Sequence, residues 1–150
     1  MREELMGISK LFLDANVFIA AAGSPEGGSS FALELCKQGR FSAICTKLVL
    51  LEAERNIHRK LGAEALLRFY QGLAELDPTL EAFPTPEELA ACEPIVGEKD
   101  AHVLAAALKS GAAFLLTLDR RHFMTKKVLD AHLDLDVMTP GDFLRELLEE

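Results

Sequence analysis

The sequence has no tryptophan, one tyrosine and three cysteines among its 150 residues. With Tyr70 as its only tyrosine, the chain is poorly supplied with the aromatic platforms on which proteins stack single-stranded bases. The cysteines, Cys36, Cys45 and Cys92, are odd in number and widely spaced, and they form no CxxC pair. This pattern does not indicate a disulfide framework or a zinc site. We therefore expect reduced core thiols and a cytoplasmic location.

Long apolar runs are also missing. No run approaches the roughly 20 residues that span a bilayer, so we expect no membrane segment. The first four residues include two acids, which argues against a secretory signal. Basic residues are few, with 16 Lys and Arg against 24 Asp and Glu, for a net charge of -8. This excess argues against a protein that coats nucleic acid nonspecifically, but not against a nuclease with a metal-neutralised acidic site.

The residues that are present indicate a globular α/β fold. Apolar residues make up 49% of the chain, and its length fits one domain over residues 1–150. Short apolar runs alternate with helical patterns, which predicts a parallel sheet covered on both faces. The predicted strands are residues 11–13, 41–45, 80–83, 113–118 and 135–138. The predicted helices are residues 30–37 (capped by Ser29 or Ser30), 47–60 (capped by Thr46), 63–76, 87–92, 98–109 and 141–149.

Two acids follow predicted strands directly. Asp14 comes after Leu11–Leu13, and Asp119 comes after the run that ends at Leu118. Because ligands bind beyond the carboxyl ends of parallel strands, both are candidates for a functional site. For either acid alone, a turn or helix cap is an equally good explanation.

Two helices supply further acids. Asp100 lies in the predicted first turn of its helix and shares an inward-facing line with Leu104 and Leu108. Its alternative role is a favourable interaction with the helix dipole. On the helix after the second strand, periodicity does not choose between Glu52 and Glu54, and both could belong to a solvated face. A cluster of these carboxylates would suit Mg²⁺ or Mn²⁺, which prefer oxygen ligands.

Four short motifs in order resemble the PIN domain family, over roughly residues 10–147. They are residues 13–18, 46–55, 99–107 and 116–123. The family's glutamate lies six residues after the capping Ser or Thr, which selects Glu52 over Glu54. The resemblance implies a three-layer α/β/α sandwich around a short, mostly parallel β-sheet. It further implies that Asp14, Glu52, Asp100 and Asp119 bind metal and act in catalysis, with Asn16 and Thr117 as supporting polar neighbours.

The family's activity would make the chain a Mg²⁺- or Mn²⁺-dependent endoribonuclease that leaves a 5′-phosphate and a 3′-hydroxyl. RNA would be its substrate, and we expect a homodimer. If the chain is the toxin of a VapBC-type toxin–antitoxin pair, an antitoxin protein would be its partner. One position departs from the family, since many members carry a further acid where this chain has His122. His122 either brings an imidazole close to the substrate or is an exposed loop histidine, and we favour the second reading.

Two other functional classes compete. The chain could be a PIN-fold module that binds RNA or protein with little or no cleavage, although the presence of all four acids counts against this. It could also be an aspartate-based phosphotransfer protein, but no lysine directly follows a strand end. Metal-dependent cleavage of a labelled RNA separates the nuclease from both.

Overall fold

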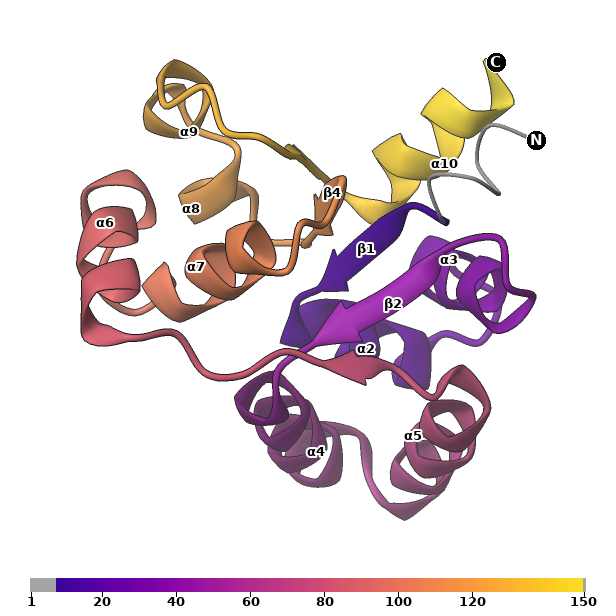
Figure 1. The fold of residues 1–150 in the computed structure, drawn as a ribbon. Coiled ribbons are helices and arrows are strands. Elements are labelled where there is room, and N and C mark those ends of the chain that lie inside the picture. The colour runs from indigo at the N-terminus through magenta and orange to yellow at the C-terminus, as the bar shows by residue number, and fades with distance from the viewer. Residues whose placement is uncertain (1–7, 150) are drawn as a thin grey trace.

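A computed structural model describes residues 8–149 of the chain. Five strands form one sheet in the order β3-β2-β1-β4-β5, and every pairing is parallel (Figure 1). The strands are β1 (Lys10–Leu13), β2 (Ser42–Cys45), β3 (Thr79–Leu80), β4 (Phe114–Leu116) and β5 (Asp136–Met138). The predicted α/β class is confirmed, and the sheet is wholly rather than mostly parallel.

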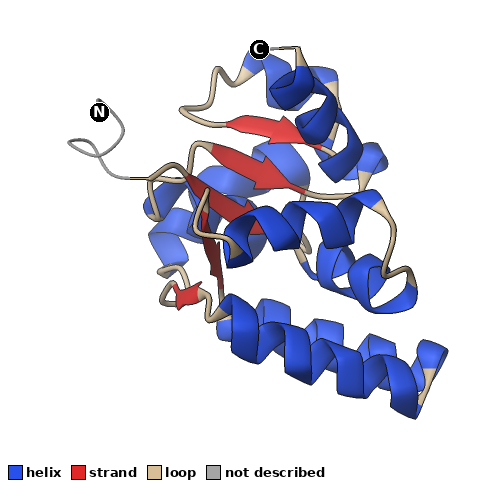
Figure 2. Ribbon diagram, turned by 90° about the vertical axis from the view of Figure 1, so that its right-hand side faces the viewer, coloured by secondary structure: helices blue, strands red, loops and turns tan. Residues whose placement is uncertain are grey.

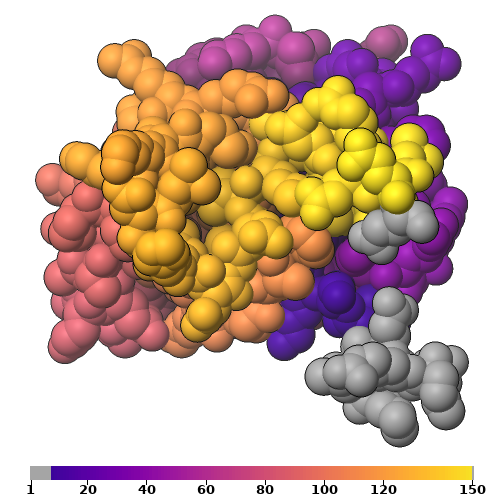
Figure 3. All heavy atoms as spheres, turned by 90° about the horizontal axis from the view of Figure 1, so that it is seen from above, coloured from indigo at the N-terminus to yellow at the C-terminus, as the bar shows by residue number. Residues whose placement is uncertain are grey.

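Helices cover both faces of the sheet, which confirms the three-layer sandwich (Figures 1 and 2). One face carries α2 (Ala15–Gly23), α3 (Gly28–Lys37), α4 (Lys47–Leu61), α5 (Ala63–Leu76) and α10 (Pro140–Leu148). The other carries α6 (Pro86–Val96), α7 (Ala101–Lys109), α8 (Arg120–Phe123) and α9 (Lys126–Asp130). Helices α8, α9 and α10 also form much of the surface seen in Figure 3.

The core lies where the central strands meet these helices. Leu11, Phe12 and Leu13 of β1 are fully buried, as are Leu115 and Leu116 of β4. Continuous apolar strands are expected in a parallel sheet, because helices bury both of its faces. The alanine-rich helix α7 is buried along most of its length, since small side chains let it lie close to the sheet. This packing fixes the carboxyl ends of β1 and β4 relative to α7.

Several predicted element boundaries are wrong. Three helices were not predicted: α2 directly after β1, and the short helices α8 and α9 after β4. The third strand is only Thr79–Leu80, since the sheet ends there and residues 81–85 turn away toward α6. The next helix runs on to Val96, past its predicted end at Cys92, and contains Pro94 in its last turn.

One of the two predicted helix caps differs from expectation. Gly27, not Ser29 or Ser30, is the N-cap of α3, and Ser30 instead donates its hydroxyl hydrogen bond to the carbonyl of Ser24 at 2.8 Å. Thr46 caps α4 as predicted, by accepting from the Val49 N–H at 3.1 Å. Leu61, the last residue of α4, lies four residues after the buried Ile57 but is 42% exposed.

No helix within residues 8–149 is long and apolar enough to cross a membrane. The acidic start of the chain, residues 1–4, lies outside the described residues, so the expectation about a secretory signal stays a prediction. All three cysteines are buried as free thiols, in agreement with their predicted place in the core.

Candidate metal-binding site at the carboxyl end of the sheet

The candidate site lies where the sheet changes its winding direction. From β1 the chain proceeds through α2 and α3 to β2, on one side of β1, whereas β4 lies on the other side and is reached through α6 and α7. Crevices form at such switch points, outside the carboxyl ends of the strands. The backbone N–H of Asp14 donates to the carbonyl of Leu116 at 3.1 Å, so the end of β1 is joined directly to the end of β4.

Asp14 is the buried member of the site. It is 7% exposed and is also the N-cap of α2, since its Oδ1 accepts from the Ala15 N–H at 2.7 Å. Its Oδ2 accepts from the Thr117 hydroxyl at 2.8 Å and from Asn16 Nδ2 at 3.3 Å. The cap interpretation is therefore confirmed, and the other oxygen of the same carboxylate connects Asp14 to Thr117 and Asn16.

Burial raises the pKa of Asp14, while the hydrogen bonds from Thr117 and Ala15 lower it and the charges of Asp100 and Glu52 raise it. The last two effects require those acids to lie close to Asp14 in the folded chain. Burial also raises the pKa of Asp100, and the charge of Asp119 raises it further. The charges of Glu52 and Asp100 thus act on Asp14, and the charge of Asp119 acts on Asp100. Glu52 lies on α4, and the three aspartates lie at the end of β1, at the start of α7 and just after β4.

Asn16 and Thr117 connect the segments that follow β1 and β4 through hydrogen bonds. Asn16 Nδ2 donates to Thr117 Oγ1 at 3.1 Å, and Asn16 Oδ1 accepts from the Leu118 N–H at 2.9 Å. Thr117 Oγ1 also accepts from the Asp119 N–H at 3.1 Å. The side chain of Asn16 therefore bridges the start of α2 to the loop after β4.

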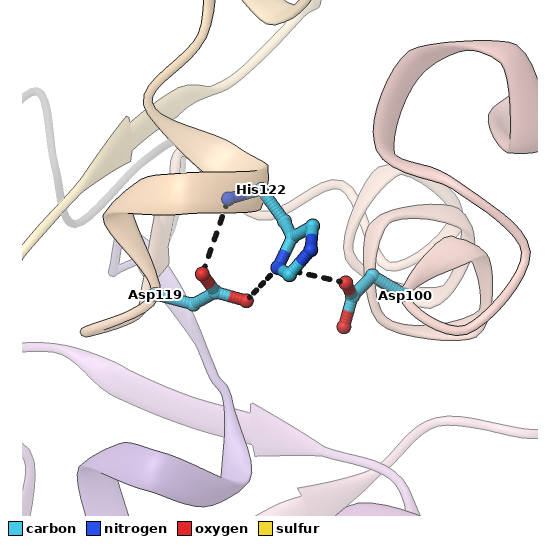
Figure 4. A group of neighbouring side chains, drawn as sticks. All are labelled: Asp100, Asp119 and His122. Atoms are coloured by element: carbon cyan, nitrogen blue, oxygen red, sulfur yellow. Dashed lines mark hydrogen bonds and ion pairs between the residues drawn. The ribbon is translucent and has the colours of Figure 1, made fainter.

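Asp100 and Asp119 form a tighter group with His122. One ligand atom from each lies within 4.8 Å of the others (Figure 4). Asp100 is the N-cap residue of α7 rather than a first-turn residue, because the helix begins at Ala101. Its side chain makes no capping hydrogen bond, which leaves the carboxylate free to face the site.

His122 is exposed, as the reading we favoured from sequence expects, but it does not lie in a loop. Its side chain is 48% exposed, and the residue lies in α8, with Nδ1 2.8 Å from Asp119 Oδ2 and 3.6 Å from Asp100 Oδ2. The sequence signal was its position, three residues after Asp119. In a helical turn that spacing returns a side chain to its capping residue.

Glu52 and Glu54 point to different surroundings. Glu54 accepts a hydrogen bond of 2.6 Å from the hydroxyl of Tyr70 on α5. Glu52 instead lies 3.8 Å, from Oε1 to Nε2, from His102 on α7. The structure therefore separates two glutamates that helical periodicity alone could not.

His102 is a second histidine whose place at the site was not predicted. It stacks on Phe83 with ring centroids 6.1 Å apart, and its buried Nδ1 has no hydrogen-bond partner among residues 8–149. Its position two residues after Asp100 was the only available signal. Two cavities within residues 8–149 lie away from these residues. One of about 590 Å³ lies between α2, α3 and α5, and one of about 400 Å³ lies on the α4–α5 hairpin.

The donor set fits a hard divalent cation. Four carboxylates supply oxygen ligands of the kind that Mg²⁺ and Mn²⁺ prefer, and His122 adds one nitrogen. Without a cation, Asp14, Glu52, Asp100 and Asp119 would hold like charges close together. Asp100, Asp119 and His122 are the residues best placed to share one ion, with Asp14 and Glu52 beside them.

Comparison with known proteins finds a match to one family model and similarity to solved structures. A family model described as the PIN domain matches residues 10–121. The crystal structure of PAE2754 from Pyrobaculum aerophilum has a TM-score of 0.59 at 15% identity, over 96% of this chain and 100% of that one. The structure of VapBC2 from Rickettsia felis bound to a promoter DNA fragment has a TM-score of 0.60 at 17% identity, over 85% and 96%.

Among curated proteins no match is found. The two solved structures share the fold, and the family model covers the first, second and third motifs together with Asp119. The chain belongs to the PIN domain family.

Proposed function

We propose that this chain is a Mg²⁺- or Mn²⁺-dependent endoribonuclease. The observation that carries the proposal is the group of Asp100, Asp119 and His122, whose ligand atoms lie within 4.8 Å of one another at the carboxyl end of the sheet. The charges of Asp100 and Glu52, which raise the pKa of Asp14, support the inclusion of Asp14 and Glu52 in the same site. Membership of the PIN domain family supports it, since the four acids lie in the sequence motifs that resemble that family.

Each residue would have a distinct part in the reaction. A bound divalent cation would supply Lewis-acid chemistry, by making a water more acidic and offsetting charge on the scissile phosphate. Asp100 and Asp119 would hold the cation, with Asp14 and Glu52 completing its surroundings. Asn16 and Thr117 would orient Asp14 through their hydrogen bonds to Oδ2.

The test is cleavage of an end-labelled single-stranded RNA by the purified chain. We expect cleavage with Mg²⁺ or Mn²⁺, none in excess chelator, and recovery when either ion is restored. Asp119→Asn should lose cleavage without unfolding, since its Oδ1 can still cap α8. Full cleavage in chelator would contradict the proposal.

A comparison of RNA binding with RNA cleavage distinguishes the nuclease from a PIN-fold module that only binds RNA. If the chain binds RNA by fluorescence polarisation but neither ion produces cleavage, the PIN-fold binding module would replace the nuclease. Matched binding by wild type and Asp119→Asn, with cleavage by wild type alone, would support the nuclease.

The finer proposal is that the chain is a toxin and forms a homodimer. Its fold likeness to VapBC2, which was solved on promoter DNA, supports an antitoxin partner. Such a partner would place an arginine among the carboxylates, because a guanidinium binds carboxylates bidentately. Induced expression should slow growth for wild type and not for Asp119→Asn, and light scattering should give twice the chain mass.

A further inference from the structure

We propose that His122 is a nitrogen ligand in a metal site shared with Asp100 and Asp119, and that it makes this site select Mn²⁺ over Mg²⁺. The inference deepens the proposed function, on which it rests, by assigning a ligand and a metal preference. It concerns a residue at which this chain departs from the acids that many family members carry.

The geometry brings one imidazole nitrogen to two carboxylates. In Figure 4 the ring of His122 lies between Asp119 and Asp100, with Nδ1 2.8 Å from one carboxylate oxygen and 3.6 Å from the other. Bonds of about 2.1 Å to a single ion place two ligand atoms roughly 3 to 4.2 Å apart. The three donor atoms, all within 4.8 Å of one another, therefore need only small shifts to share one ion, which would replace the proton that Nδ1 donates to Asp119 and release it to solvent.

The local backbone holds the ring in this position. Asp119 is the N-cap of α8, and its Oδ1 accepts from the backbone N–H of His122 at 3.1 Å. The other oxygen of the same carboxylate faces Nδ1 of the ring. One aspartate thus fixes both the start of α8 and the direction of the imidazole, so the ligand atoms are arranged before any ion binds.

The type of donor atom at position 122 determines which ion binds more tightly. Imidazole nitrogen binds first-row transition metals well, whereas Mg²⁺ prefers oxygen ligands and keeps much of its water. An aspartate at position 122 would give an oxygen set that suits Mg²⁺ better. The histidine should therefore raise the ratio of Mn²⁺ affinity to Mg²⁺ affinity above that of an otherwise identical site.

A plain ion pair is the competing explanation for His122. In that case the imidazole only offsets the charges of Asp100 and Asp119 and competes with the cation. The two explanations predict opposite effects of removing the ring. Loss of a ligand weakens Mn²⁺ binding, whereas loss of a competing positive charge strengthens it.

The experiment measures metal binding directly, without RNA. Free Mn²⁺ is followed by its EPR signal during titration of wild type, His122→Ala and His122→Asp, and Mg²⁺ is measured by competition. His58→Ala, an exposed histidine on α4, is the control. We expect Mn²⁺ to bind His122→Ala at least about tenfold more weakly, and the Mn²⁺ to Mg²⁺ ratio to fall about tenfold in His122→Asp.

Pulsed EPR of the bound Mn²⁺ gives a second readout. A directly bound nitrogen should couple to the ion in wild type and His58→Ala, and the coupling should vanish in both His122 variants. Mn²⁺ binding without nitrogen coupling, coupling that persists in His122→Ala, or tighter binding by His122→Ala would each overturn the inference while leaving the proposed nuclease intact. Failure of wild type to bind Mn²⁺ at all would overturn both.

Discussion

The hydroxyl of Thr117 donates a hydrogen bond of 2.8 Å to Oδ2 of Asp14, across 103 residues of sequence. Thr117 is fully buried, and its oxygen also accepts from Asn16 and from the backbone of Asp119. One hydroxyl therefore ties the end of β1 to the end of β4 and fixes two of the four acids relative to each other.

We predict that Thr117→Val destabilises the protein by about 1 to 3 kcal/mol. Valine keeps the shape of threonine but leaves the Asp119 N–H without its acceptor and removes a donor to Asp14. Since that donor lowers the pKa of Asp14, its loss should also weaken metal binding at neutral pH. Urea unfolding and Mn²⁺ titration measure both effects. Thr117→Ser, which keeps the hydroxyl, is the control, and equal behaviour of Val and Ser would contradict the assigned role.

Replacement of the two competing glutamates should have unequal effects on cleavage. We predict that Glu52→Gln lowers turnover by about a hundredfold or more, because this side chain lies beside Asp14 and His102. Glu54→Gln should change turnover less than about threefold, since Glu54 faces Tyr70. Single-turnover RNA cleavage measures both rates. Equal losses of turnover in the two variants would contradict the assignment of Glu52 rather than Glu54 to the site.

We predict that Asp100→Asn stabilises the metal-free protein by about 1 kcal/mol at pH 7. Two charges 4.8 Å apart repel by about 3.5 kcal/mol at an effective dielectric of 20, and solvent and His122 reduce this. Asp100 makes no capping hydrogen bond that asparagine would lose. Thermal melts with chelator and with Mn²⁺ test this, and the variant should lose most of the stabilisation that metal gives to wild type. A less stable metal-free variant would contradict the predicted repulsion.

The raised pKa of Asp100 predicts that the stability of the metal-free protein depends on pH. The pKa of Asp100 is raised in the folded protein above its ordinary value of 3.8, so its ionisation costs stability. That cost is complete above the folded pKa and disappears as the pH falls below the unfolded value. We therefore expect the stability difference between Asp100→Asn and wild type to close as metal-free samples are taken from pH 7 toward pH 4. A difference that stays constant over this range would show that the pKa of Asp100 is not raised.

The buried thiols should be inert in the native state. Burial raises the pKa of Cys36 and Cys45 to about 12, so very little thiolate is present at pH 8. We predict that a thiol reagent modifies the folded protein at least about a hundredfold more slowly than the protein in denaturant. Rapid native labelling, followed by mass spectrometry, would locate a thiol that is more accessible than the structure indicates.

The sequence alone predicted a parallel sheet and the resemblance to the PIN domain family. Short apolar strands alternating with helices predicted the parallel sandwich, because parallel strands are buried on both faces. It also placed Asp14 and Asp119 at strand ends, where topology brings distant residues together. It did not identify the short helices α8 and α9, whose few residues carry too little periodicity to be recognised.

The direction in which side chains of α4, α7 and α8 point could not be predicted from the sequence and is seen in the folded structure. The direction of a side chain depends on helix start points and on packing against neighbouring elements, neither of which local sequence specifies. Beginning α7 at Ala101 rather than three residues earlier made Asp100 a cap residue with a free carboxylate. Folding likewise pairs Glu54 with Tyr70, away from the site, and brings the ring of His122 back to Asp119. Neither contact can be read from the sequence neighbours of these residues, because each depends on how the helices pack or where they begin.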